Sequence, residues 1–166
     1  TMGMKLSYYN NTAAGTQIYA DPEQLKRVIY NIVNNATKYA RQTPSTLHVR
    51  IEETLPENPP PPLYRQLSKD GSDLKPLEKP PEYIRIQIED EGPGIPAQDL
   101  PHIFDRFYRA DTSRSSSTGG SGLGLSIVRK IITDHGGHVW AESIEGVGTS
   151  INFALKKMHR KEDTNE

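Results

Sequence analysis

Two amides, an ammonium group and an aromatic ring lie close together in the stretch Asn31-Ile-Val-Asn-Asn35-Ala-Thr-Lys38-Tyr39. Asn31, Asn35 and Lys38 stand at i, i+4 and i+7, which places them along one side of a helix. Such groups can hold Mg²⁺ through an amide oxygen, phosphate through an ammonium and a purine through ring stacking. An asparagine at position 31 cannot act as a base at neutral pH. The stretch is therefore predicted to bind a nucleotide without hydrolysing it.

Each of these residues also has an ordinary explanation. Asn35 can be a polar residue on a helix surface, Lys38 a solvated charge and Tyr39 a core aromatic at the helix end. Their proximity within a few residues favours the functional interpretation over three separate coincidences.

A second candidate site is Asp90-Glu-Gly92-Pro-Gly94-Ile95, at the end of a predicted strand. An acidic residue followed by glycines also forms an ordinary turn. In a binding site, a buried carboxylate could accept a hydrogen bond from an exocyclic amine such as that of adenine. The glycines would let the backbone approach a flat base closely.

A third candidate site is Gly119-Gly120-Ser121-Gly122-Leu123-Gly124-Leu125, which leads directly into a predicted helix. Backbone amides at a glycine-rich helix N-terminus favour bound phosphate. A flexible linker would also be rich in glycine and serine, but no amphipathic helix would follow it at once. The pattern favours a phosphate cradle over a plain linker.

Hydrophobic spacing predicts the elements that must position these residues. A helix should begin with Asp21 as N-cap and Pro22 in its first turn, and Gln24 should complete a capping box. Its buried stripe should comprise Leu25, Val28, Ile29, Ile32, Val33 and Ala36. A second helix is expected over 123–135, ended by Gly136-Gly137.

Alternation of apolar and polar residues predicts the strands. Half-buried strands at 47–51 and 84–89 should be hairpin neighbours, and two closing strands at 138–141 and 149–155 should flank a Gly146-Val-Gly148 turn. Two short strands are expected around Tyr8-Tyr9 and over 16–20, separated by a turn-rich segment. Ile103, Phe104 and Phe107 have near-helical spacing.

The 54–82 stretch contains Pro59 to Pro62 and a further pair, Pro80-Pro81. Proline supplies no amide donor and resists helices and central strands, so we expect an extended excursion on the surface. It is either a tolerated loop insertion or a docking site for a partner.

Composition limits the class of protein. The 166 residues suit one domain over 1–158, followed by a charged tail at 159–166, and the net charge of −1 gives no field for nucleic acid or an anionic membrane. The absence of cysteine excludes disulfides and thiolate metal sites. No apolar run approaches the ~20 residues that span a bilayer, so we expect no membrane contact. Thr1-Met2-Gly3-Met4 is typical of an added leader, and the natural polypeptide is expected to be longer.

Together, these segments resemble the catalytic, ATP-binding domain of bacterial sensor histidine kinases, of the gyrase, heat-shock chaperone, histidine kinase and mismatch-repair ATPase superfamily. The N box matches 31–39, the first glycine box 90–94, the F box 103–109, the second glycine box 120–124 and the last glycine box 146–149. The resemblance implies an α+β fold, a two-layer α/β sandwich of the Bergerat type. Its mixed, mostly antiparallel sheet should have about five strands packed on about three helices.

The resemblance also implies site roles. Asn35 corresponds to the Mg²⁺ ligand, Asn31 lines the same site, Lys38 reaches phosphate and Tyr39 stacks on adenine; Asn31, Asn35 and Lys38 are the implied catalytic set. Asp90 corresponds to the residue that reads the adenine amine, Gly94 and Ile95 shape the pocket floor and Thr149 supports Asp90. Residues 109–121 correspond to the ATP lid, from which Arg109 or Arg114 could approach the γ-phosphate. The remaining implied nucleotide contacts are Gly92, Phe107, Gly120, Gly122, Leu123, Gly124 and Leu125.

By the same resemblance, the chain is a protein-histidine kinase that uses ATP and Mg²⁺. Hydrolytic relatives carry a glutamate at the position of Asn31, so its absence favours phosphoryl transfer to a protein nucleophile. In the family that nucleophile is a histidine on a separate dimerisation domain, and none of this chain's histidines has the family's helical His-Glu or His-Asp context. These histidines are His48, His102, His135, His138 and His159.

The implied partners are therefore the dimerisation domain of the same parent protein and, indirectly, a response regulator. We expect the fragment to be a monomeric cytoplasmic domain. The parent protein is expected to be a homodimer that is anchored in the inner or plasma membrane. A non-catalytic nucleotide-sensing module is the competing hypothesis. An ATPase or serine kinase of the superfamily is a third, disfavoured by position 31 and the F box.

Overall fold

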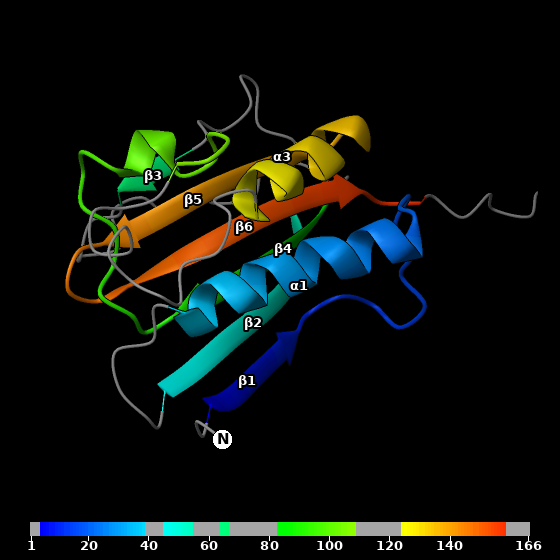
Figure 1. Ribbon diagram of the computed structural model, residues 1–166. Coiled ribbons are helices and arrows are strands. Elements are labelled where there is room, and N and C mark those ends of the chain that lie inside the picture. The colour runs from blue at the N-terminus through cyan, green and yellow to red at the C-terminus, as the bar shows by residue number, and fades with distance from the viewer. Residues whose placement is uncertain (1–3, 39–44, 55–63, 67–82, 109–123, 159–166) are drawn as a thin grey trace, which may run out of the picture.

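The computed structural model describes residues 4–38, 45–54, 64–66, 83–108 and 124–158. These residues form a six-stranded sheet with two α-helices on one face (Figure 1). The elements are β1 (Met4–Asn10), α1 (Pro22–Lys38), β2 (Ser45–Thr54), β3 (Tyr64–Gln66), β4 (Tyr83–Asp90), the 3-10 helix η1 (Leu100–His102), α3 (Gly124–Asp134), β5 (His138–Ile144) and β6 (Gly148–Lys156). The predicted α+β sandwich is confirmed.

The strands follow the order β1-β2-β4-β6-β5-β3. The pairs β2–β4, β4–β6 and β5–β6 are antiparallel, whereas the edge strands β1 and β3 pair in parallel with β2 and β5. The predicted pairing of the segments around 47–51 and 84–89 is confirmed, and so are the two closing strands. β3 is an unexpected sixth strand within the proline-rich stretch.

The core lies between the sheet and the two helices. Val28 and Ile32 of α1 meet Val128 and Ile132 of α3 in a cluster whose sheet side includes Phe153 of β6, and all five side chains are fully buried. The alternation within β4 and β6 turns their isoleucines, Phe153 and Leu155 toward the helices. Ile29 was predicted in the buried stripe of α1, but it is 38% exposed, because it lies at the flank of the helix and not on its sheet-facing side.

The start of α1 depends on Asp21. Its Oδ1 accepts hydrogen bonds from the amides of Glu23, at 2.9 Å, and Gln24, at 3.3 Å, as an N-cap requires. The predicted capping box is incomplete, however. The amide of Asp21 donates instead to Nε2 of His135, at 3.1 Å, just after the end of α3. His135 Nδ1 contacts the carbonyl of Ile131 at 2.7 Å, so one imidazole joins the end of one helix to the start of the other.

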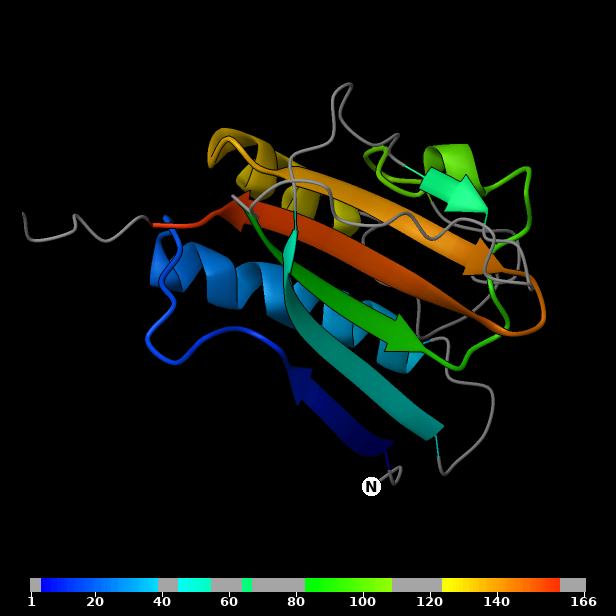
Figure 2. The same ribbon diagram turned by 180° about the vertical axis from the view of Figure 1, so that it is seen from behind.

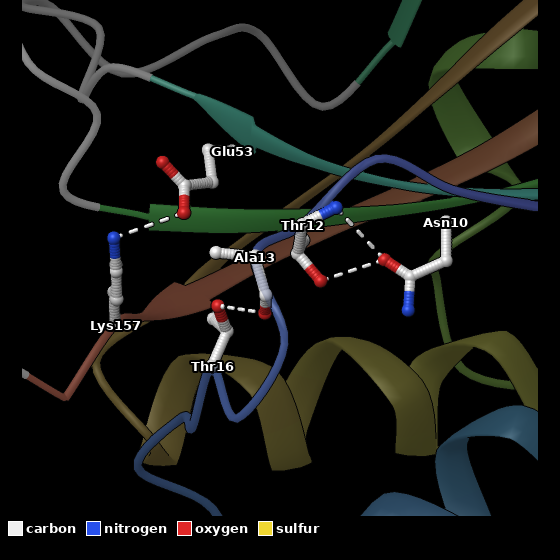
Figure 3. Close-up of polar contacts among 6 residues, drawn as sticks. All are labelled: Asn10, Thr12, Ala13, Thr16, Glu53 and Lys157. Carbon is white, nitrogen blue, oxygen red and sulfur yellow. Dashed lines mark hydrogen bonds and ion pairs between the residues drawn. The ribbon is translucent and has the colours of Figure 1, made fainter.

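The connection from β1 to α1 begins with the expected polar turn (Figure 3). Asn10 Oδ1 accepts hydrogen bonds from the amide and the hydroxyl of Thr12, and the Thr16 hydroxyl donates to the carbonyl of Ala13. The predicted strand over 16–20 is wrong, because only an isolated bridge forms between Ile18 and Lys157. That bridge closes one end of the core beside the Lys157–Glu53 ion pair, whose Nζ and Oε1 atoms are 2.9 Å apart.

No helix in the described ranges is long and apolar enough to cross a membrane.

The cap geometry gives a test of the fold. Replacing the N-cap carboxylate (Asp21→Ala) leaves two α1 amides without their acceptor, which should lower the free energy of unfolding by about 1 kcal/mol. Gln24→Ala is the matched control, since the Gln24 side chain completes no capping box. Chemical denaturation followed by circular dichroism measures both. A Gln24→Ala loss as large as that of Asp21→Ala would contradict the assigned cap.

Candidate functional site

A pocket of about 120 Å³ opens between α1, the segment after β4, the start of α3 and β6. Its lining is mainly apolar, with Asn35, Asp90, Tyr108 and Thr149 as its polar side chains. The remaining lining residues are Ile32, Ala36, Ile88, Pro93, Gly94, Ile95, Pro96, Ile103, Leu125 and Ile151. A mostly apolar cavity with a few directed polar groups suits a flat organic ligand with a polar edge.

Asp90 is the only carboxylate among the described residues that line the pocket. Its Oδ1 accepts hydrogen bonds from the amides of Gly92, at 2.9 Å, and Thr149, at 3.3 Å. Burial raises the pKa of Asp90 above its ordinary value of 3.8, and these two amide bonds only partly counteract the effect. No hydrogen bond to Oδ2 is present among the described residues, which leaves that oxygen available to a ligand donor.

The next carboxylate, Glu91, has the opposite environment. It is exposed, and its Oε1 lies 2.9 Å from Nε2 of His48 on β2. The hydrogen bond from His48 lowers the pKa of Glu91. In the run Glu89-Asp90-Glu91, the Asp90 carboxylate therefore lies in the pocket, whereas that of Glu91 is paired outside it.

The floor of the pocket is fixed to the β5–β6 hairpin. The amide of Ile95 donates to Oγ of Ser143 at 2.9 Å, and the Ser143 hydroxyl in turn donates to the carbonyl of Gly148 at 3.1 Å. Oγ1 of Thr149 lies 3.0 Å from the same Ser143 oxygen. One buried hydroxyl therefore holds the glycine-containing loop and the residue that supports Asp90 in one arrangement.

Two glycines allow this close approach. Gly94 has a φ of +73°, and a Cβ there would lie 2.4 Å from the carbonyl oxygen of Ile144. A Cβ on Gly148 would lie 2.1 Å from the carbonyl oxygen of Asp90. Side chains at either position would push the loop away from the hairpin, so both glycines are required by contact and not only by flexibility.

Asn35 lines the pocket from α1, and Asn31 lies one turn earlier on the same helix. A Cβ on Gly124 would lie 3.8 Å from Oδ1 of Asn31, so the first residue of α3 is adjacent to that amide. Leu125, the next residue, is buried in the pocket wall. The structure thus brings together the beginning of the predicted phosphate-binding helix and the two asparagines.

The two consecutive aromatic residues of the F box have different environments. Phe107 is 65% exposed and its ring lies under the guanidinium of Arg106, with Cζ 5.5 Å from the ring centre, and its expected nucleotide contact stays a prediction. Tyr108 lines the pocket, and its hydroxyl donates to Oδ1 of the buried Asp99. Phe107 has a φ of +63°, which turns the chain so that the two consecutive rings diverge.

Several predicted site residues lie outside the described residues, and their predictions remain untested. They are Tyr39, Arg109, Arg114, Gly120, Gly122 and Leu123, together with the rest of the proposed lid at 109–121. Lys38 ends α1, but only its backbone is described.

The sequence did not single out Ser143 or Tyr108. Ser143 looks like an ordinary polar residue at a strand end, and the partner through which it holds the pocket floor, Ile95, is 48 positions away in sequence. A signal for Tyr108 was present, because it is the second of two adjacent aromatic residues and a polar ring is the better choice for a pocket wall with a buried acceptor. The apolar pocket residues of α1 and β4 were predicted only as core.

Comparison with known proteins agrees with this geometry. Residues 20–159 match the family described as histidine kinase-, DNA gyrase B-, and HSP90-like ATPase. The chain belongs to this family. The resemblance to the ATP-binding catalytic domain of sensor histidine kinases is therefore confirmed, and use of ATP follows from it.

Individual relatives are sensor kinases. The chain is 36% identical over 143 residues to sensor histidine kinase WalK of Bacillus subtilis (strain 168), covering 86% of this chain and 19% of the relative. It is 38% identical over 135 residues to sensor protein kinase WalK of Staphylococcus aureus, covering 81% and 26%. The chain thus spans about a fifth to a quarter of the length of these relatives.

Solved structures show the same fold. A mycobacterial sensor histidine kinase, MprB, has a TM-score of 0.68 at 25% identity, over 95% of this chain and 86% of that chain. The catalytic domain of histidine kinase ThkA has a TM-score of 0.64 at 25% identity, over 92% and 78%.

A glycine pair tests how the pocket floor is held. Gly94→Ala should lower the free energy of unfolding by more than about 2 kcal/mol, because it combines a positive φ with a backbone collision. Gly146→Ala is the control: its φ is +83°, but nothing lies within 4 Å of the added Cβ, so only the cost of the φ, about 1 kcal/mol, is expected. Urea denaturation compares the two variants. Equal losses would show that contact with the hairpin does not determine the need for Gly94.

Proposed function

We propose that this chain is the catalytic domain of a sensor histidine protein kinase, which transfers the γ-phosphoryl group of ATP to a histidine on a separate dimerisation domain. One observation carries the proposal. The carboxylate of Asp90 lies in an apolar pocket with Oδ1 held by two amides and Oδ2 open to a ligand. The family and the similarity to sensor kinases support the same conclusion.

The base of the nucleotide fits this end of the pocket. Oδ2 of Asp90 can accept the hydrogen bond of the exocyclic amine of adenine. Gly94 contributes bare backbone to the pocket floor and Ile95 contributes an apolar side chain. The apolar walls from Ile88 and Leu125 can cover the faces of the ring. A carboxylate as acceptor favours adenine over guanine, which presents a carbonyl at the corresponding position.

The phosphate end fits the opposite side, where α1 meets α3. The amides at the start of α3 begin at Gly124, beside Asn31, and a helix N-terminus favours anions. The side-chain oxygen of Asn35 is a hard ligand of the type that Mg²⁺ takes, and no group of three or more acidic, His or Cys side chains in the described residues could hold a metal. Mg²⁺ would thus be held mainly by the phosphates and by Asn35, and it would neutralise their charge.

The residues around the phosphate end favour transfer over hydrolysis. Asn31 cannot take a proton from water. Asp90, the carboxylate of the described pocket lining, is assigned to the adenine ring and so lies at the other end of the pocket from the phosphates. Catalysis would consist of positioning the phosphates and neutralising their charge. We assign Lys38 to a phosphate, Tyr39 to stacking on adenine, and Arg109 or Arg114 to the γ-phosphate, all on the basis of the family resemblance.

The proposal extends to partners. The phosphoacceptor domain would belong to the same parent protein, whose homodimer would phosphorylate a response regulator in a second step. This domain would act in the cytoplasm, and another part of the parent protein would anchor it to the membrane.

The assignment of Asp90 is tested with Asp90→Asn. Asparagine retains an oxygen for the two amides but offers the adenine amine no charge, so affinity for Mg²⁺–ADP should fall about 10- to 100-fold, the worth of a hydrogen bond to a charged group. Titration calorimetry measures the affinity.

Stability should respond in the opposite direction. The folded-state pKa of Asp90 is raised, so its ionised form costs stability at neutral pH, and this cost disappears as pH falls to the unfolded value of 3.8. Asp90→Asn should therefore be at least as stable as the unchanged chain at pH 7, with the difference shrinking in acid. Unchanged affinity for Mg²⁺–ADP would contradict the assignment of Asp90 to adenine. A large loss of stability would mean that the change in affinity does not report on recognition of adenine.

The reaction is tested with the dimerisation domain that the proposal assigns to the same parent protein. Radiolabelled ATP should yield acid-labile phosphate on that domain, and the chain alone should release little inorganic phosphate. Asn35→Ala should slow transfer at least about tenfold through the lost metal contact, whereas Asn34→Ala, exposed on the same helix, should not. Robust steady-state hydrolysis by the isolated chain would contradict the argument from Asn31, and nucleotide binding without any transfer would favour a non-catalytic sensing module.

A further inference from the structure

The segment from the pocket floor to Tyr108 makes one turn every three residues. The amides of Asp99 and His102 donate to the carbonyls of Pro96 and Asp99, each at 2.9 Å. The same spacing continues to the amide of Asp105, at 2.9 Å, and to that of Tyr108, at 3.4 Å. Side chains three positions apart lie above one another in such a spiral, so the residues at 99, 102, 105 and 108 share one side of the segment. Figure 2, seen from behind, shows the middle of the segment around η1, in green, beside β3 at the end of the sheet where β5 finishes.

The other side of this segment is fixed to the core. Leu100 and Phe104 are each only 3% exposed and belong to the hydrophobic cluster beneath α1 and α3. Ile103 packs against the same cluster and lines the pocket. The segment is therefore anchored by apolar contacts before it reaches Tyr108, which forms part of the pocket wall.

Asp99 does not have the usual role of an aspartate at its position. It is the N-cap residue of η1, where an aspartate ordinarily accepts a hydrogen bond from a backbone amide of the first turn, but its side chain makes no cap hydrogen bond. Asp99 is only 8% exposed, and its Oδ1 accepts the hydroxyl hydrogen of Tyr108, nine positions further on. Burial of a carboxylate costs free energy that an apolar residue would avoid. Neither capping nor packing therefore accounts for an acid at this position.

The position of Tyr108 depends on contacts beyond its own backbone. Phe107 has a φ of +63°, a conformation that a bulky residue adopts only where its surroundings hold it. Two contacts hold the ring that follows. One is the hydrogen bond to Asp99, and the other is the ring of His102, whose centre is 5.3 Å from that of Tyr108. Nδ1 of His102 lies 3.1 Å from Oδ2 of Asp105, so the imidazole is itself held in place.

We propose that Asp99 is a positioning residue for nucleotide binding, which acts by holding the ring of Tyr108 in the wall of the pocket. The inference rests on the proposed function, because it concerns the ligand of the same site. Asp99 itself is absent from the described pocket lining, so its effect on a ligand passes through Tyr108. Without the hydrogen bond the unfavourable backbone conformation at Phe107 relaxes, the ring leaves the wall and the pocket opens on this side.

Two substitutions remove the hydrogen bond from its two ends. Asp99→Ala removes the acceptor, and Tyr108→Phe removes the hydroxyl but keeps the ring. Each should weaken binding of Mg²⁺–ADP about tenfold, as expected for a lost hydrogen bond to a charged group. The double substitution should weaken binding no further than the stronger single one, because both remove the same bond. Titration calorimetry measures the affinities, and circular dichroism establishes that each variant is folded.

Two further variants separate positioning from a general effect on the fold. Asp99→Asn keeps an oxygen that can accept the hydroxyl hydrogen of Tyr108, so its affinity should stay within about threefold of that of the unchanged chain. Tyr19→Phe is the matched control for loss of a tyrosine hydroxyl, since the Tyr19 side chain is 55% exposed in the connection before α1. Its affinity should not change. If Asp99→Ala does not fold, Tyr108→Phe and Asp99→Asn decide the question.

The inference and the proposed function fail in different ways. An unchanged chain that binds no nucleotide would contradict the proposed function and this inference with it. An unchanged chain that binds Mg²⁺–ADP, together with a folded Tyr108→Phe that binds it equally well, would contradict this inference alone and leave Asp99 a purely structural role. Additive losses in the double variant, or an Asp99→Asn variant as weak as Asp99→Ala, would also overturn it, because the effect would then not pass through the hydrogen bond to Tyr108.

Discussion

The site depends on one constraint, the contact of the loop after β4 with the β5–β6 hairpin. The amide of Gly146 donates to the carbonyl of Pro93 at 2.7 Å, and the amide of Ile95 donates to Ser143. Gly148 lies directly against the backbone of Asp90. These contacts set the distance from which Thr149 can reach the Asp90 carboxylate. If the loop moved outward, the pocket would lose its floor and the Asp90 carboxylate would lose one of its two amides. The contacts that pack the loop against the hairpin are therefore also the contacts that form the ligand site.

The polar residues at the two ends of the pocket are held in position by different parts of the fold. Asp90 is positioned by β-structure, through strand pairing and a hairpin, whereas Asn31 and Asn35 are positioned by the packing of α1 against the sheet and against α3. The two helices are also joined at their opposite ends, where His135 receives the amide of Asp21. A helix fixed at its start and packed along its length can hold two side chains one turn apart with little freedom.

Local signals predicted most of the fold. Asp21 and Pro22 identified the start of α1, and alternation identified the four central strands, because these patterns depend on neighbouring residues. The predictions failed where the structure depends on contacts between residues that are far apart in sequence. The partner of the Asp21 amide is 114 positions away, so His135 and not Gln24 completes the cap. The place of Tyr108 in the pocket wall follows a residue with positive φ, Phe107, that no local pattern predicts, and the parallel pairing of β3 depends on a strand far along the chain.

The raised pKa of Asp90 explains why such a site can be both costly and selective. A carboxylate that is desolvated before a ligand arrives has already lost part of its hydration, and two amides on Oδ1 do not fully replace it. A ligand that donates to Oδ2 therefore offsets an existing cost instead of exchanging one water for another. A ligand with an acceptor there would leave the charge buried and unpaired, and its binding would be opposed. Discrimination between donor and acceptor ligands thus arises from the desolvation of the Asp90 carboxylate in the free protein. The hairpin contact maintains this desolvation by holding Asp90 inside the pocket.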